Sequence, residues 1–206
     1  MQSFKSFLAE LNKPKELDQL RKTLSKTVTS VDSRNDKWTG SITDVMKAYD
    51  FKKLGSGKYG SVYGNAKYPY VIKVFMKDSA YIRWIKFCMS NQDNKYIPKI
   101  KGKVIKLTPF VYAIRLEKLT PTSMSGPFNS AYSKWMADSS YRDSDSDIND
   151  ILDNFTENKK LLDLHSENVM ARGKQLVVID PYYNWFNKHK SMDFTIDPNE
   201  LDISVF

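Results

Sequence analysis

Cysteine is almost absent from this chain of 206 residues, in which Cys88 is the single example. One cysteine excludes an internal disulfide framework and is typical of a reducing compartment. Its neighbours Phe87 and Met89 favour a buried structural thiol. Long apolar runs are absent too. No segment approaches the roughly 18 apolar residues of a membrane span, and the start of the chain lacks the apolar stretch of a signal peptide. We therefore expect a soluble, cytoplasmic protein without a membrane partner.

The composition is that of a folded protein, because 41% of the residues are hydrophobic, enough for one medium domain or one domain with an extension. The formal net charge of +8 comes from 32 basic and 24 acidic residues. One local basic cluster is present, made of Lys95, Lys99, Lys101, Lys103 and Lys106. Such a cluster favours a solvated face, with an acidic partner or a phosphate as the alternative. We expect no specific binding of nucleic acid.

Residues 1–48 carry apolar side chains at helical spacing and predict a helical extension. The residues that set this spacing are Phe4, Phe7, Leu8 and Leu11, and, after Pro14, Leu17, Leu20, Leu24 and Val31. Amphipathic helices of this kind bind a membrane surface, a partner or their own domain. Packing on their own domain is the favoured alternative.

Residues 49–118 predict a five-stranded sheet with one helix. Short β-rich stretches occupy 51–64 and 68–76, the segment 78–90 has helical spacing, and two further stretches occupy 102–108 and 110–119. Residues 119–206 form a mostly helical remainder. In it, a polar and acidic loop at 139–147 offers Asp145 or Ser146 as a helix cap. A helix then follows with Ile148, Ile151, Leu152, Phe155 and Leu162 on one face, and the strand-like run QLVVIDPYY is cut off by Pro181.

The stretch LGSGKYGSVYG contains a G-x-G-x-x-G motif formed by Gly55, Gly57 and Gly60, with Val62 two positions on. Alone this motif is weak, because glycines at turns usually serve the turn. Here it lies between two strand-like runs, which is the hairpin arrangement that folds over ATP phosphates. Lys73 follows in the middle of an apolar strand. A buried lysine is rare without a partner, so a phosphate partner fits, whereas an edge strand with Lys73 facing water is the alternative.

The stretch KLLDLHSENVM brings together candidate groups for phosphoryl transfer. Asp163 and Asn168 are five residues apart, and Asp180 follows at the end of the strand LVVI. Phosphoryl transfer to an alcohol needs a carboxylate that orients the hydroxyl and oxygen ligands that hold Mg²⁺ on the phosphates. Asp163, Asn168 and Asp180 supply these roles in that order.

From 49 to about 185 the sequence resembles the protein kinase superfamily. The glycine motif matches the family's first motif, Lys73 its β3 lysine, DLHSEN its catalytic loop and Asp180 its magnesium-binding Asp. The resemblance implies a compact, truncated, two-lobe α+β fold with ATP and Mg²⁺ as cofactors. In it, Asp163 is the base, with Asn168 and Asp180 on the metal.

The resemblance also implies a nucleotide site. AIRLEKLTP looks like the last strand of the small lobe running into the hinge, so that backbone groups of Glu117 and Leu119 hold adenine, while Val62 and Val71 belong to the same site. Within the superfamily, VIKV, KFCM, DLHSENVM, IDP and FTIDPNEL are most similar to the small Ser/Thr kinases of T7-like bacteriophages. This finer resemblance implies a phage enzyme that phosphorylates host proteins in the host cytoplasm. The oligomeric state stays open.

Several positions depart from the family pattern. Leu161 and Leu162 replace the His-Arg before the base, Pro181-Tyr182 replaces Phe-Gly, and 26 residues follow Asp180. The helix at 78–90 has no Glu to pair with Lys73, so Glu10 or Glu16 is the candidate substitute.

His165 stands where the family has a lysine, as in aminoglycoside phosphotransferases, and has either a catalytic contact with phosphate or a structural hydrogen bond. These departures keep two alternatives open: a small-molecule phosphotransferase, and a pseudokinase that acts by contact.

Overall fold

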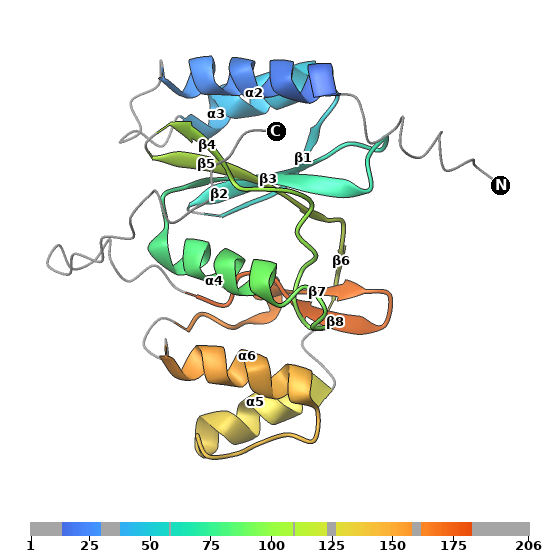
Figure 1. Cartoon of the computed structure of the whole chain (residues 1–206). Coiled ribbons are helices and arrows are strands. Elements are labelled where there is room, and N and C mark those ends of the chain that lie inside the picture. Colours follow the sequence, from blue (N-terminus) through green and yellow to red (C-terminus); the bar gives the residue numbers. More distant parts are fainter. Residues whose placement is uncertain are drawn as a thin grey trace, which may run out of the picture. The chain divides into compact units, whose positions relative to one another are not determined.

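The structure is a computed structural model that describes residues 14–29, 38–57, 59–108, 110–122, 127–157 and 162–182. It is an α+β protein with antiparallel sheets (Figure 1). In chain order the elements are α2 (Pro14–Thr29), α3 (Trp38–Ala48), β1 (Lys52–Gly57), β2 (Gly60–Gly64), β3 (Tyr70–Met76), α4 (Ser79–Ser90), β4 (Ile105–Thr108), β5 (Val111–Glu117), β6 (Thr120–Pro121), α5 (Pro127–Ala137), α6 (Ser146–Glu157), the 3-10 turn η2 (Ser166–Asn168), β7 (Val169–Arg172) and β8 (Gln175–Val178).

The chain divides into two compact units, which are described separately. The first consists of Met1–Lys77 and Val104–Ile114, and the second of Asp78–Lys103 and Arg115–Phe206. The helix α4, which the sequence analysis grouped with the sheet of residues 49–118, therefore belongs to the second unit. No helix in the described part of the chain is long and apolar enough to cross a membrane.

The first unit is built on the predicted five-stranded sheet, with strand order β1-β2-β3-β5-β4. The strands β3 and β5 are the most apolar and lie inside the sheet, where side chains of both faces are buried. The pairs β1–β2, β2–β3 and β4–β5 are antiparallel, and the register of β1 against β2 shifts between Lys53 and Gly55.

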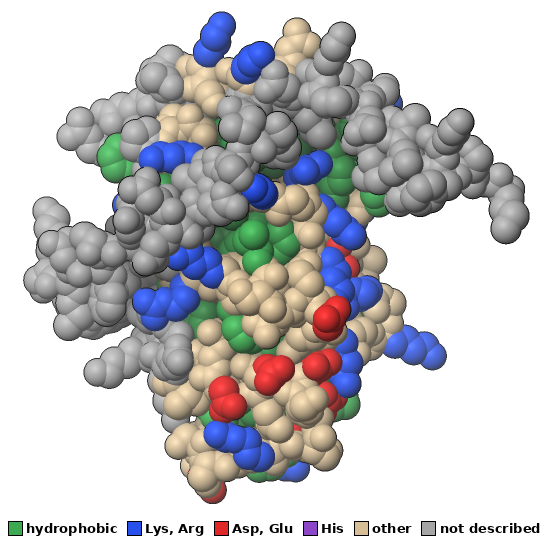
Figure 2. All heavy atoms as spheres, in the orientation of Figure 1, with side chains coloured by type: hydrophobic (Ala, Val, Ile, Leu, Met, Phe, Trp, Pro, Cys, Tyr) green, Lys and Arg blue, Asp and Glu red, His purple; other side chains and the backbone are tan. Residues whose placement is uncertain are grey.

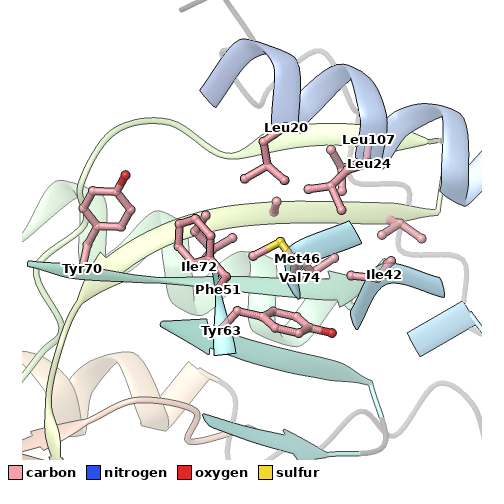
Figure 3. Close-up of a cluster of buried hydrophobic side chains, with 12 residues drawn as sticks. Leu20, Leu24, Ile42, Met46, Phe51, Tyr63, Tyr70, Ile72, Val74 and Leu107 are labelled. Carbon is pink, nitrogen blue, oxygen red and sulfur yellow. The ribbon is translucent and has the colours of Figure 1, made fainter. Parts of the chain in front are cut away.

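The core of the first unit lies between this sheet and the helices α2 and α3 (Figure 3). Leu20 and Leu24 of α2, together with Ile42 and Met46 of α3, are at most 3% exposed. Side chains buried to this degree contribute about 1.5–3 kcal/mol each. The predicted helical periodicity at 17–24 is confirmed by α2, whereas the predicted helix at 4–11 and Val31 lie outside the described residues.

In the second unit, α4, α5 and α6 share an aromatic core. Trp84, Trp135 and Phe155 are fully buried, and the rings of Trp84 and Phe155 each form a T-shaped pair with the Tyr182 ring, at centroid distances of 6.1 and 5.8 Å. Asp78 caps α4, because its side chain accepts hydrogen bonds from the backbone N–H groups of residues 80 and 81. Cys88 is buried in this unit, as predicted.

The helix α6 confirms the predicted apolar face, on which Ile148, Ile151, Leu152 and Phe155 are fully buried. As predicted, Asp145 acts as its cap, and its side chain accepts a hydrogen bond from the Asp147 N–H at 3.1 Å. The prediction that Leu162 continues this face is wrong. The described helix ends at Glu157, and Leu162 instead forms a β-bridge with Tyr182 because its backbone pairs with the chain after β8.

Candidate functional site

The glycine motif forms the predicted hairpin between β1 and β2, in which Gly57 pairs with Gly60 and Gly55 with Val62. Gly60 is needed for packing, since a Cβ atom there would lie 2.9 Å from the carbonyl oxygen of Val74. A Cβ atom on Gly55 or Gly57 would meet nothing within 4 Å. A side chain at 55 or 57 would therefore meet no clash inside the first unit, and the predicted approach of phosphates to these two glycines stays a prediction.

Lys73 lies on β3, the central strand of the sheet, with β2 on one side and β5 on the other. The edge-strand alternative for this lysine is therefore wrong. Lys73 is half-buried and stands opposite Val62, while Val71 on the same strand is 8% exposed and stands opposite Gly64. Of the residues predicted for nucleotide binding, the first unit thus places Val62, Val71 and Lys73 together beside the glycine hairpin.

In the second unit, two chain segments meet around Asp180. Leu162 bridges to Tyr182, and the N–H of Asp163 donates to the carbonyl of Pro181 at 2.7 Å. On the other side, the N–H of Ile179 donates to the carbonyl of Asn168 at 2.9 Å. These bonds hold Asp163 beside the residue after Asp180 and Asn168 beside the residue before it. The structure therefore brings together the three groups that the sequence predicts for base and metal binding.

The side chain of Asn168 is fixed within this loop. Its Nδ2 donates to the backbone carbonyl of Asp163 at 2.6 Å and lies 3.2 Å from Nε2 of His165. Because the amide nitrogen is used in this way, the amide oxygen is the side-chain atom that remains for a ligand. An oxygen ligand is what Mg²⁺ requires.

His165 has structural partners on both ring nitrogens. Its Nδ1 accepts a hydrogen bond from the N–H of Glu167 at 3.3 Å, and its Nε2 lies 3.7 Å from Oδ1 of Asp163 in addition to its contact with Asn168. The side chains of His165 and Asp163 are 46% and 41% exposed. The structural alternative for His165 is thus present in the fold, and a contact with phosphate stays a prediction.

The helix α4 places Tyr81 within the electrostatic influence of Asp180. Burial, and then the negative charge of Asp180, raises the pKa of the Tyr81 hydroxyl well above its usual value, so that this group stays protonated. Among the described residues, α4 carries no acidic side chain that would pair with Lys73. Of the predicted substitutes, Glu10 lies outside the described residues, and nothing is described of the side chain of Glu16.

Glu117, predicted to contact adenine through its backbone, ends β5. Its N–H donates to the carbonyl of Lys99 at 2.9 Å, and its carboxylate binds the guanidinium of Arg172, with 2.8 Å between Oε2 and Nε. Leu119 lies two residues on, between β5 and β6. The sequence analysis missed Arg172, because its partner is 55 residues away and no local pattern links the two.

The metal ligands predicted here are Asn168 and Asp180. No group of three or more His, Cys, Asp and Glu side chains that could hold a metal ion occurs in the described part of the chain. Magnesium on a nucleotide is commonly held by one or two protein oxygens, with phosphate and water oxygens completing the octahedron. The carboxylate of Asp180 and the fixed amide of Asn168 fit this donor set.

The predicted basic cluster is partly neutralised within the second unit. Lys95 pairs with Asp145 at 2.5 Å, and the ammonium of Lys99 donates to the carbonyl of Gln92. On the face shown in Figure 2, basic side chains are dispersed, with acidic side chains beside several of them. For Lys95 and Lys99 these contacts agree with the solvated-face interpretation, and an acidic partner or a phosphate stays the untested alternative.

No protein-family model matches this sequence, and no curated protein does. Among solved structures, the chain is similar to the crystal structure of Rad53 1-466 in complex with AMP-PNP, with a TM-score of 0.38 and 14% sequence identity. The match covers 71% of this chain and 42% of that chain, so the chain spans less than half the length of the protein it matches. Similarity at this level concerns at most a kinase-like fold.

Proposed function

We propose that this protein is an ATP- and Mg²⁺-dependent protein kinase that transfers the γ-phosphate to Ser or Thr residues of proteins. The observation that carries the proposal is the pairing of the segments 162–168 and 179–182, which holds Asp163 and Asn168 on the two sides of Asp180. This pairing supports a site in which the half-exposed carboxylate of Asp163 and the candidate oxygen ligands Asn168 and Asp180 act together, as phosphoryl transfer to an alcohol needs.

In the proposed reaction, Asp163 accepts a hydrogen bond from the acceptor hydroxyl and takes its proton as the oxygen attacks the γ-phosphorus. The bond between that phosphorus and the β,γ-bridging oxygen breaks, and ADP leaves. Asn168 and Asp180 would hold Mg²⁺, which supplies positive charge that neutralises the phosphate oxygens. The amide nitrogen of Asn168 also donates to the backbone carbonyl of Asp163. This one hydrogen bond therefore links the proposed metal ligand Asn168 to the residue that carries the proposed base.

The other proposed nucleotide contacts come from the glycine hairpin and β3. The open space at Gly55 and Gly57 supports an approach of phosphate oxygens to the hairpin backbone. Lys73 is proposed to hold the α- and β-phosphates, with Val62 and Val71 as apolar contacts. The carbonyl of Glu117 and the backbone of Leu119 are proposed to contact adenine, since the Glu117 N–H is already used.

Two alternatives differ from this proposal: a phosphotransferase with a small-molecule acceptor, and a pseudokinase that transfers no phosphate. His165 and the Asp180-Pro181 pair favour a small-molecule phosphotransferase, and the missing acidic residue on α4 favours a pseudokinase. The intact set of Asp163, Asn168 and Asp180 supports a catalytic function. We further propose that the acceptors are host proteins in the cytoplasm of a bacterium.

Incubation with γ-labelled ATP, Mg²⁺ and a bacterial lysate tests the proposal. We expect label in protein bands that yield phosphoserine or phosphothreonine on hydrolysis. Label found in small molecules and not in protein would contradict this proposal and support a small-molecule phosphotransferase. Absence of label, together with retained ATP binding, would support the pseudokinase.

A further inference from the structure

Arg172 is the centre of a dense polar network in the second unit. Its Nε donates to Oε2 of Glu117 at 2.8 Å, and its Nη2 donates to Oε1 of the same carboxylate. The remaining donors reach the backbone carbonyls of Lys95 at 3.0 Å and Ile97 at 2.9 Å. A guanidinium that binds a carboxylate through two nitrogens fixes both direction and distance, which an ammonium does not.

Glu117 is held from a second direction. The N–H of Lys99 donates to its Oε1 at 2.7 Å, while its own N–H donates to the carbonyl of Lys99 at 2.9 Å. Its side chain is 12% exposed and that of Arg172 is 31% exposed, so the carboxylate is largely removed from water and the guanidinium partly so. Charges in such surroundings are costly unless each keeps its partner.

The segment that follows Glu117 is also tied to β7, the strand that carries Arg172. Thr120 and Pro121 of β6 pair with Ala171 and Met170 of β7, and Oγ1 of Thr120 donates to the carbonyl of Ala171 at 3.2 Å. Residues 118 and 119 thus lie between two residues that are bound to β7, namely Glu117, which is bound to Arg172, and Thr120, which pairs with Ala171. The same strand begins directly after Asn168.

We propose that Arg172 is a positioning residue for nucleotide binding. It sets the place of the backbone at 117–119 relative to β7 and thereby fixes the polar backbone groups that read the adenine base. This inference rests on the proposed function, because it assigns the 117–119 segment to the base. It predicts that loss of the ion pair weakens ATP binding and leaves the transfer step itself unchanged.

The test compares Arg172→Gln and Glu117→Gln with a control, Asp145→Asn. The control removes the charge partner of Lys95 in the same part of the second unit, and asparagine keeps an acceptor oxygen for the helix cap. Each purified full-length variant is first checked for native circular dichroism. Binding of a fluorescent ATP analogue with Mg²⁺ is then measured, together with kcat and with KM for ATP and for the acceptor protein.

We expect each single variant at the ion pair to weaken binding of the analogue and to raise KM for ATP by about tenfold, with kcat within twofold of wild type. Arg172→Lys should restore binding only in part, because an ammonium cannot bind the carboxylate through two nitrogens. The double variant Glu117→Gln/Arg172→Gln should bind better than either single variant, since no buried charge is left without its partner. Asp145→Asn should bind like wild type.

Two results would overturn this inference while leaving the proposed function intact: wild-type affinity in folded ion-pair variants, or an equal loss of affinity in Asp145→Asn. If the folded wild-type protein itself binds no ATP analogue, both the proposed function and the inference fail. If Arg172→Gln alone fails to fold, the affinities of Glu117→Gln and Arg172→Lys decide the question, because both variants probe the same ion pair.

Discussion

At the scale of single residues, the candidate site is held together by a few hydrogen bonds that link its own residues. The amide nitrogen of Asn168 donates to the backbone carbonyl of Asp163, and the N–H of Asp163 donates to the carbonyl of Pro181. The first bond fixes the side chain of Asn168, and the second fixes the backbone of Asp163 beside Pro181. Single substitutions that conserve shape should separate these roles.

The first prediction concerns the division of labour between two carboxylates. Asp163→Asn should bind Mg²⁺ and ATP like wild type, because this side chain is proposed to contact the acceptor and not the metal. Asp180→Asn should lose Mg²⁺-dependent binding by at least about tenfold, because an amide oxygen lacks the charge that favours a divalent cation. Titration calorimetry with a non-hydrolysable ATP analogue, with and without Mg²⁺, measures both. Equal affinities of the two variants would contradict the assignment.

The second prediction concerns His165. If its ring holds the amide of Asn168 in place, His165→Ala should raise the Mg²⁺ concentration needed for half-maximal activity severalfold, with little change in KM for ATP. If the ring contacts phosphate instead, KM for ATP should rise at saturating Mg²⁺. Glu167→Ala is a matched control, because Glu167 meets His165 through its backbone N–H alone among the interactions described for it.

At the scale of elements, polar contacts join the segment after α4 to the start of α6. The residue before α6 and the first turn of α6 accept hydrogen bonds from the chain after α4. The Tyr96 hydroxyl donates to Asp145 at 3.0 Å, the Lys95 N–H donates to Asp147 at 3.2 Å, and the Asn94 amide donates to the Asp147 carbonyl at 2.7 Å. These bonds dock the capped start of α6 onto the segment 94–96.

The third prediction uses the titration of Tyr96. Burial, and then the hydrogen bond to Asp145, raises the pKa of its hydroxyl to about 12. Since the folded-state pKa lies above the unfolded value, the protonated hydroxyl stabilises the fold below pH of about 10, and this contribution is lost as the pH rises from there toward 12.

Tyr96→Phe cannot titrate and should show a shallower fall of Tm between pH 10 and pH 11.5 than wild type, while its Tm at pH 7 should be lower. Thermal melts monitored by circular dichroism measure both. Parallel Tm curves for the two proteins would show that the Tyr96 hydroxyl does not contribute.

Local patterns were predictable from the sequence, and contacts between distant segments were not. The glycine hairpin, the strand that carries Lys73 and the loop from Asp163 to Asn168 each depend on residues close in sequence, so spacing and residue type identify them. The partners Asn154 and Tyr182 are 28 residues apart, and Glu117 and Arg172 are 55 apart. Such pairs leave no periodicity, and only the fold brings them together.

At the scale of the whole molecule, the two residues directly after Asp180 are anchored. Tyr182 is 5% exposed, packs against Trp84 and Phe155, and accepts a hydrogen bond from the Asn154 amide at 2.6 Å. Pro181 fixes its own φ angle, and its carbonyl is bound by Asp163. In the proposed kinase, Leu162 would stand where switched kinases have the arginine that pairs with a phosphate on the activation loop. These features favour an enzyme that is active as synthesised.

The fourth prediction follows from this anchoring. Conversion of Ser139, Ser140, Ser144 and Ser146 to Ala should leave the initial rate within about twofold of wild type, and phosphatase treatment should have no effect. A phosphate in this loop would add charge near Asp143, Asp145 and Asp147, and the nearby Arg142 already pairs with Asp153 at 3.0 Å. Loss of activity on dephosphorylation that is restored by re-phosphorylation would reveal a switch.

The central claim is that the loop paired around Asp180 is a phosphotransfer site, and the most direct measurement is the initial rate of label transfer from γ-labelled ATP to protein. The comparison is between wild type, Asp163→Asn and the control Asp153→Asn, which changes an exposed carboxylate on α6. Loss of a general base predicts a rate lower by about 10² to 10⁴ in Asp163→Asn, whereas the control should match wild type. Equal rates for Asp163→Asn and wild type would contradict the account.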